Sequence, residues 1–258
     1  MTAAAAQVRL VAARSVRRTL RQPVLVVPTL LFPLLLLAVN SAGLADATRI
    51  PGFPADSYLD FAIVVPFMQA ALFAAVTAGT ELATDIQKGF LDRLQLTPLR
   101  RVAILLGQLA GATALALVGA VVYVAVGLVA GVGFASGPLG VVVLIAFAVY
   151  VALAFAGIGS FFGARTGSAE AVQGLFPLIF VLFFLSTMNM PADLIEVGWY
   201  RAIAAHNPVS WLIDALRSLV IEGWDAGTLA AGLATATGML VLSFALASRA
   251  LATRMGRT

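Results

Sequence analysis

The sequence predicts an all-α membrane protein, and three observations support this fold class. Of the 258 residues, 61% are hydrophobic and 11% are charged, whereas soluble domains carry about 25% charged residues. A helix needs about 20 apolar residues to cross a bilayer, and six segments of the chain are long enough. Basic residues gather at alternate ends of these segments. Together these features exclude a soluble globule, a disordered tail and a nucleic-acid-binding protein.

The six apolar segments are expected to be helices of one transmembrane domain that covers residues 1–258. Backbone groups cannot remain unpaired in lipid, so a helix is favoured over a strand for each of them. The third segment is long enough to tilt or to project beyond the bilayer. The predicted spans are residues 24–44, 58–80, 102–131, 138–163, 171–190 and 226–248.

The distribution of basic residues predicts the orientation of the chain. Thirteen of the 16 lysines and arginines fall on one side of the predicted spans, and only Arg49, Arg201 and Arg217 fall on the other. Basic residues concentrate in cytoplasmic loops, so both termini are expected in the cytoplasm. Ser15 to Arg18 loosely resemble a twin-arginine signal, but five further spans and a continuous basic inner side favour a retained segment.

The N-terminal segment, residues 1–23, has the spacing of an amphipathic helix. Arg14, Arg17, Arg18 and Arg21 share one face, and apolar residues lie roughly opposite. Such a helix is expected to lie in the inner membrane interface, with its basic face toward anionic headgroups. The alternative is a basic tail that only obeys the topology rule.

The segment between the second and third spans, residues 81–101, combines seven charges with apolar side chains. Gly89 and Pro98 interrupt helical structure on either side, so a short helix from about residue 90 to residue 96 is expected. An amphipathic cytoplasmic helix suits docking into a groove of a soluble partner. The alternative is a solvated loop that folds back onto the membrane.

The last outer segment, residues 191–225, carries all three tryptophans of the chain. Their amphipathic rings favour the headgroup region. Asn207 is expected to cap a helix that Pro208 begins, because proline lacks the N–H that would be left unpaired there. The pattern predicts one or two short helices that dip into the outer leaflet before the last span.

Two ordered motifs carry a resemblance to a known family. The inner motif is Glu81, Lys88-Gly89, Leu91, Leu94, Leu96-Thr97-Pro98-Leu99-Arg100-Arg101 and Leu105-Leu106-Gly107-Gln108. The outer motif is Asn207-Pro208, Asp214, Leu216-Arg217, Leu219 and Gly223. With the basic N-terminal helix and six spans, this combination resembles the membrane subunit of ABC type-2 exporters over the whole chain. It looks most similar to bacterial daunorubicin and doxorubicin exporter permeases, although Asp85-Ile86-Gln87 stands where the family often has Glu-Arg-Glu.

The resemblance implies a permease in a bacterial plasma membrane that works as a homo- or heterodimer with two ATPase subunits. ATP and Mg²⁺ would be bound by that partner. The residues agree, because a phosphate-binding loop needs a glycine-rich run followed by Lys-Ser or Lys-Thr. The only lysine, Lys88, is followed by Gly89 and has no such loop around it. We therefore expect no catalytic residue, no cofactor and no metal site in this chain.

The resemblance also implies which residues couple ATP hydrolysis to transport. Residues 89–97 would sit in a groove of the ATPase. The arginine-bearing helix would pair with Glu81 or Asp85 at the inner mouth, because an acid beside lipid headgroups is better placed when paired. The expected coupling residues are Glu81, Asp85, Lys88, Gly89, Phe90, Leu91, Arg93 and Leu94.

The family places its pathway at the dimer interface, between the second and fifth spans. The four phenylalanines of the fifth span follow helical spacing and predict a single aromatic stripe. Phenylalanine has no hydrogen-bonding group, so lipophilic cargo is favoured over a sugar chain. The alternative is a stripe used for packing or lipid contact. The candidate pathway residues are Phe67, Gln69, Phe73, Phe176, Phe180, Phe183 and Phe184.

Four other functions are weighed against the drug exporter. An exporter of a lipid or lipid-linked glycan shares the same fold. A secondary transporter is less favoured, because proton-coupled transporters usually retain a charge in a span and here none lies mid-span. An intramembrane hydrolase would pair Ser160 or Ser186 with His206, but no G-x-S-x-G motif occurs. A purely structural subunit that acts only when assembled is the fourth.

Overall fold

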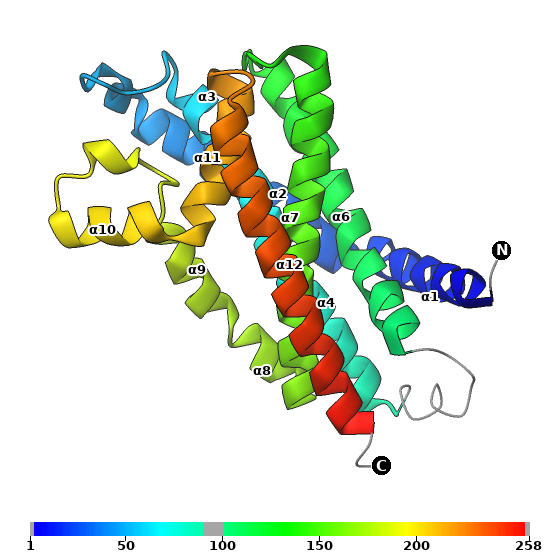
Figure 1. Ribbon diagram of the computed structural model, residues 1–258. Helices are drawn as coiled ribbons and strands as arrows, with labels where there is room; N and C mark the ends of the chain where they lie inside the picture. The colour runs from blue at the N-terminus through cyan, green and yellow to red at the C-terminus, as the bar shows by residue number, and fades with distance from the viewer. Residues whose placement is uncertain (1–2, 90–100, 256–258) are drawn as a thin grey trace.

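The computed structural model describes residues 3–89 and 101–255, and every regular element among them is a helix (Figure 1). The predicted all-α class is therefore confirmed. The α-helices are α1 (Ala3–Leu20), α2 (Pro23–Gly43), α3 (Tyr58–Ala62), α4 (Val65–Gln87), α6 (Arg101–Val129), α7 (Gly137–Thr166), α8 (Ala169–Gln173), α9 (Phe176–Phe184), α10 (Gly198–His206), α11 (Pro208–Ile221) and α12 (Ala226–Met255). Two short 3₁₀ helices are η1 (Ala45–Arg49) and η2 (Ala192–Leu194).

Within the described residues, five helical stretches are long and apolar enough to cross a membrane. They are Pro23–Gly43, Tyr58–Gln87, Leu105–Val129, Gly137–Thr166 and Ala226–Arg254. These stretches correspond to five of the six predicted spans, and the second of them consists of α3 followed by α4.

The predicted fifth span, residues 171–190, is not one continuous helix. The chain forms the short helices α8 and α9 instead, with a break at Gly174 and Leu175, and α9 ends at Phe184. Pro177 lies in the first turn of α9, where its missing N–H costs no helical hydrogen bond. Residues 169–184 would span about 24 Å as an ideal helix, less than the about 30 Å of a typical hydrocarbon core.

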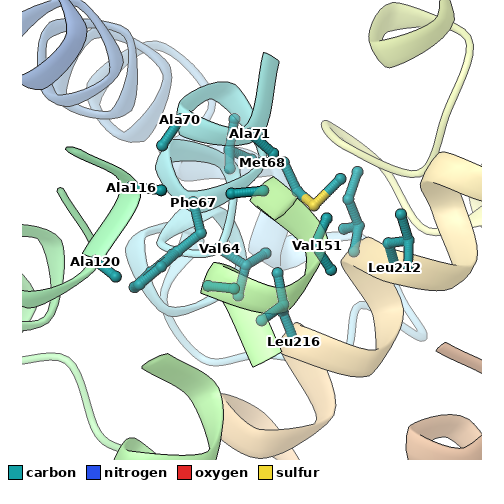
Figure 2. Packing of buried hydrophobic residues seen from close by; sticks show 14 of the residues in the cluster. Val64, Phe67, Met68, Ala70, Ala71, Ala116, Ala120, Val151, Leu212 and Leu216 are labelled. Atoms are coloured by element: carbon teal, nitrogen blue, oxygen red, sulfur yellow. The ribbon is translucent and has the colours of Figure 1, made fainter. Parts of the chain in front are cut away.

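Helix α4 occupies the centre of the bundle. In the stretch that contains it, 89% of the most apolar window is buried, against 17% for the stretches of α2 and of α12. Figure 2 shows side chains of α4 meeting those of α6, α7 and α11 in one core. Many core positions of α4 are alanine, which lets the neighbouring helices approach closely. The labelled members from α4 are Phe67, Met68, Ala70 and Ala71.

Helices α4 and α7 touch through their backbones at three glycines. A Cβ atom placed on Gly79 would lie 2.5 Å from the carbonyl oxygen of Gly159. A Cβ on Gly159 would overlap the carbonyl group of Ala75, and one on Gly163 would overlap that of Gly79. Small residues at these positions therefore set the spacing of the two central helices.

Helix α4 also extends seven residues beyond the predicted end of the second span at residue 80. Glu81 and Asp85 consequently lie in the last turns of this helix rather than in a loop. The helix ends at Gln87, and Gly89 adopts a φ of +64°, a conformation that glycine reaches without steric cost. Of the predicted coupling residues, Phe90, Leu91, Arg93 and Leu94 lie outside the described residues.

The predicted cap of the outer segment is present. The Oδ1 atom of Asn207 accepts a hydrogen bond from the backbone N–H of Val209 at 2.9 Å, and Pro208 is the first residue of α11. Two short helices, α10 and α11, precede the last long helix as expected. Figure 1 shows α10 standing out from the bundle while α11 packs into it.

Candidate functional site

An arginine–carboxylate cluster joins α1 to the end of α4 that is predicted to be cytoplasmic. Asp85 is 2% exposed, and its carboxylate accepts a hydrogen bond from Nη1 of Arg18 at 2.9 Å. Nη1 of Arg14 lies 3.5 Å from the other oxygen of Asp85. Glu81, one turn earlier on α4, lies 4.0 Å from Nε of Arg18. The arginine-bearing helix therefore pairs with both of the acids that the sequence singled out.

Two buried hydroxyl groups complete this cluster. Oγ1 of Thr19 donates to Glu81 at 2.9 Å, and Oγ of Ser15 donates to the other oxygen of Glu81 at 3.4 Å. The backbone N–H of Gly111 in α6 donates to Oγ of Ser15 at 3.2 Å. A Cβ on Gly111 would overlap both hydroxyls. Helix α1 is thus attached to α4 and α6 together.

Two of the four predicted interfacial arginines, Arg14 and Arg18, pair with acids of α4. Arg14 and Arg18 turn toward the acids of α4, although the Arg14 side chain is 44% exposed. Arg17 is exposed, and so is Arg21, which follows the last residue of α1. Arg14 and Arg18 are four residues apart, so their side chains lie on one side of the helix. The sequence interpretation missed Ser15 and Thr19, which share the same i, i+4 spacing beside Arg14 and Arg18.

A cavity of about 210 Å³ adjoins the cluster and extends toward the bundle. Most of its lining groups are polar, and they come from α1, the start of α2, α4 and α8. The lining residues are Arg18, Gln22, Leu25, Val76, Thr77, Thr80, Glu81, Thr84 and Gln173.

Five phenylalanines from three helices form a continuous aromatic ladder next to this cavity. Phe32 of α2 meets Phe73 of α4 edge to face at 6.2 Å, and Phe73 meets Phe176 of α9 at 5.8 Å. Phe176 then stacks on Phe180 at 5.4 Å, and Phe180 meets Phe184 at 5.0 Å. These centroid distances are those of favourable ring pairs. Phe184 is 47% exposed at the end of the ladder.

Three predicted pathway residues lie in the interior of the protomer instead. Phe183 is fully buried and meets Phe155 of α7 at 5.9 Å, so it does not take part in the ladder formed by the other three phenylalanines of the fifth span. Consecutive residues of a helix point about 100° apart, which separates Phe183 from Phe184. Phe67 is 2% exposed and meets Tyr123 at 5.6 Å, and Gln69 is also 2% exposed.

Comparison with known proteins decides the family. The model of the ABC-2 type transporter family matches residues 6–221. The chain belongs to the ABC-2 type transporter family. It is 32% identical to the daunorubicin resistance ABC transporter permease protein DrrB1 of Streptomyces coeruleorubidus over 222 residues, covering 80% of this chain and 72% of that protein. It is 27% identical to the probable doxorubicin resistance ABC transporter permease protein DrrC of Mycobacterium tuberculosis, covering 84% of this chain and 78% of that protein.

In this ABC-2 permease, the arginine–carboxylate cluster and the aromatic ladder both include residues of α4. Glu81 and Asp85 lie at one end of α4, and Phe73 lies two to three turns further in. The family match and the long apolar helices make the chain a multi-pass membrane subunit of the ABC exporter type.

Proposed function

We propose that this chain is the membrane-spanning subunit of an ATP-driven exporter that moves lipophilic or amphipathic drug-like compounds out of the cell. Membership of the ABC-2 family supports the transport role, and the names of two relatives refer to daunorubicin and doxorubicin resistance. The observation that carries the proposal is the placement of the α1 contact and of Phe73 on the same helix, α4.

The coupling step begins at residues 81–101. A partner ATPase binds ATP and Mg²⁺ and holds residues 89–97, including Phe90, in a groove. Closure of the ATPase pushes on the inner end of α4. Arg18 binds both Asp85 and Glu81, so α1 moves with α4 instead of sliding past it.

The cargo preference follows from the aromatic ladder. Its rings offer apolar surface and no hydrogen-bonding group, which suits flat or greasy molecules. The polar cavity includes Thr77, four residues from Phe73, and Gln173, three residues from Phe176. An amphipathic compound can therefore place a polar end in the cavity while its apolar part lies on the rings. A lipid or lipid-linked glycan is the second candidate cargo, and an ATP-independent secondary transporter is the more distant alternative.

The proposal includes two partners and an orientation. A second permease, identical or related, completes the pathway, and an ABC ATPase supplies the energy. Both termini lie in the cytoplasm of a bacterium, as the basic residues indicate.

The test is to co-express this chain with its partner ABC ATPase and to purify the complex. We expect ATP hydrolysis by the complex to change on adding lipophilic compounds such as anthracyclines, and the ATPase subunit alone is the control. A complex that responds to lipid-linked glycans and not to lipophilic drugs would favour the second candidate. A complex whose hydrolysis responds to neither would contradict the proposal.

A further inference from the structure

The segment that follows α9 is buried without being helical. Residues 185–189, here called the outer gate segment, connect the end of α9 to the turn that leads into η2. Ser186, Thr187 and Met188 are each no more than 3% exposed. Non-helical backbone at membrane depth persists only where protein groups satisfy its polar atoms. The partners of this segment therefore decide whether it stays in place.

Arg217 of α11 supplies the central partner. Its Nη2 atom donates to the carbonyl oxygens of Thr187 at 3.1 Å and of Met188 at 3.4 Å. Its Nε atom donates to the carbonyl oxygen of Phe61 at 3.2 Å, and the guanidinium lies 3.6 Å from the centroid of the Phe61 ring. One side chain thus joins the outer gate segment to the first turn of the second span, at Phe61.

Asp214 reinforces the same contact. Its Oδ1 atom accepts from Nη1 of Arg217 at 3.0 Å and from the hydroxyl of Thr187 at 2.9 Å. Thr187 is consequently held twice, through its carbonyl by Arg217 and through its hydroxyl by Asp214. Its backbone N–H donates to Oγ of Ser210 at 3.1 Å.

The end of α9 is held by two further side chains. Nδ2 of Asn207 donates to the carbonyl oxygens of Leu182 at 2.7 Å and of Leu185 at 3.0 Å. The hydroxyl of Tyr200 donates to the carbonyl oxygen of Phe184 at 2.8 Å. Carbonyls left over at a helix end thereby find side-chain partners from α10 and α11.

The outer gate segment also has space beside it. A cavity of about 310 Å³ is lined by Thr187, Asp214 and Arg217 together with residues of the η2 region. Phe184, the last ring of the aromatic ladder, immediately precedes the segment. Cargo that reaches Phe184 would meet the outer gate segment next.

We propose that Arg217 is the latch of an outer gate: it holds residues 185–189 closed, and release of its bonds to Thr187 and Met188 lets cargo leave. This inference rests on the proposed function for the route of the cargo. Arg217 is a positioning residue, since it acts on cargo only through the segment. Its pairing with Asp214 lies within α11 and can persist when the two carbonyl bonds break, so the guanidinium is never left unpaired.

Cysteine labelling tests the latch directly, because the chain contains no cysteine. Met188→Cys places one thiol in the closed segment, and a membrane-impermeant maleimide is added outside intact, energy-depleted cells that carry the chain with its ATPase. We expect slow labelling with Arg217 present and labelling about tenfold faster or more with Arg217→Gln, because charge-assisted hydrogen bonds are lost. The matched control is Arg201→Gln, which removes an exposed arginine of α10 and leaves labelling slow.

A second reporter separates an opened gate from a misfolded protein. Val151→Cys lies in the core of α7 and is 1% exposed. The latch predicts that Arg217→Gln accelerates labelling at position 188 alone. Equal labelling of Met188→Cys with Arg217 and with Arg217→Gln would overturn the latch, and so would faster labelling at both positions. Neither measurement needs cargo or ATP, so failure of the proposed drug export would leave this result unchanged.

Discussion

Arg18 of α1 donates a hydrogen bond of 2.9 Å to Asp85 of α4, although 67 positions separate the two residues in the chain. The Asp85 side chain is buried, while that of Arg18 is 28% exposed. An acid removed from water in this way is stabilised only while a cation stays beside it. The contact therefore fixes α1 against the end of α4 from which the coupling segment continues.

Removing this cation should destabilise the protein and weaken coupling. For Arg18→Gln we expect a loss of about 1–3 kcal/mol, less than the 3–5 kcal/mol of a fully buried pair, because Arg18 is partly exposed and Arg14 remains. Thermal unfolding in detergent and drug export in cells measure the two effects. Arg17→Gln, on the exposed side of α1, is the control. Equal losses for both variants would show that the pairing has no special role.

The glycine contact between α4 and α7 predicts a severe packing defect. A methyl group on Gly159 overlaps the carbonyl group of Ala75, so Gly159→Ala should cost about 1–3 kcal/mol through overpacking. Gly238 of α12 has no neighbouring atom within 4 Å of an added Cβ, so Gly238→Ala should stabilise by about 0.5–1 kcal/mol. Melting temperatures of the two variants should move in opposite directions. A Gly159→Ala protein as stable as Gly238→Ala would refute this packing.

The aromatic ladder predicts a selective loss of transport. Replacing Phe180 and Phe184 by alanine should lower the drug tolerance of cells and leave the amount of protein in the membrane unchanged. Leu178→Ala, at a 66% exposed position of the same helix, is the control and should change neither. Unaltered tolerance in the double variant would remove the ladder from the pathway.

Phe183 offers a contrast on the same helix. Its ring is fully buried against Phe155, so Phe183→Ala should cost about 3–5 kcal/mol of stability by leaving a cavity. Thermal unfolding measures this cost. A Phe183→Ala protein that keeps its melting temperature but loses drug export would return Phe183 to the pathway.

The coupling segment predicts a separation of hydrolysis from transport. Phe90→Ala combined with Leu94→Ala should remove apolar side chains that dock in the ATPase. Hydrolysis by the complex should then continue without drug-dependent change, and export should be lost, while membrane insertion remains normal. The measurement is the ratio of export to hydrolysis in vesicles. An unchanged ratio would contradict the docking role.

Hydropathy predicted the membrane class and six spans, five of which are long helices among the described residues, because a span is defined by composition over about 20 residues. The cap at Asn207 was equally predictable, since it depends on two adjacent residues. The break before Phe176 was not, because proline is common in membrane helices and only packing decides whether a helix stops.

Site residues were predictable where helical spacing or opposite charge indicates the partner. Helical spacing placed Phe180 and Phe184 together, but it could not show that Phe183 meets Phe155, a contact set by the position of α7. The pairing of the arginine-bearing helix with Glu81 or Asp85 was predicted from charge, but the particular arginine, Arg18, was not. Thr19 and Ser15 were missed, because a hydroxyl group is uncharged and the sequence does not indicate which group it will bind.

An ATPase that acts through residues 81–101 is proposed to drive transport by this chain. Inverted membrane vesicles that hold the chain with its ATPase subunit test this coupling, with a fluorescent anthracycline as the reporter. We expect the drug to accumulate in the vesicles on adding ATP, and not to accumulate when the ATPase carries an inactivated nucleotide site. Accumulation by vesicles that contain this chain alone, or with the inactive ATPase, would contradict it.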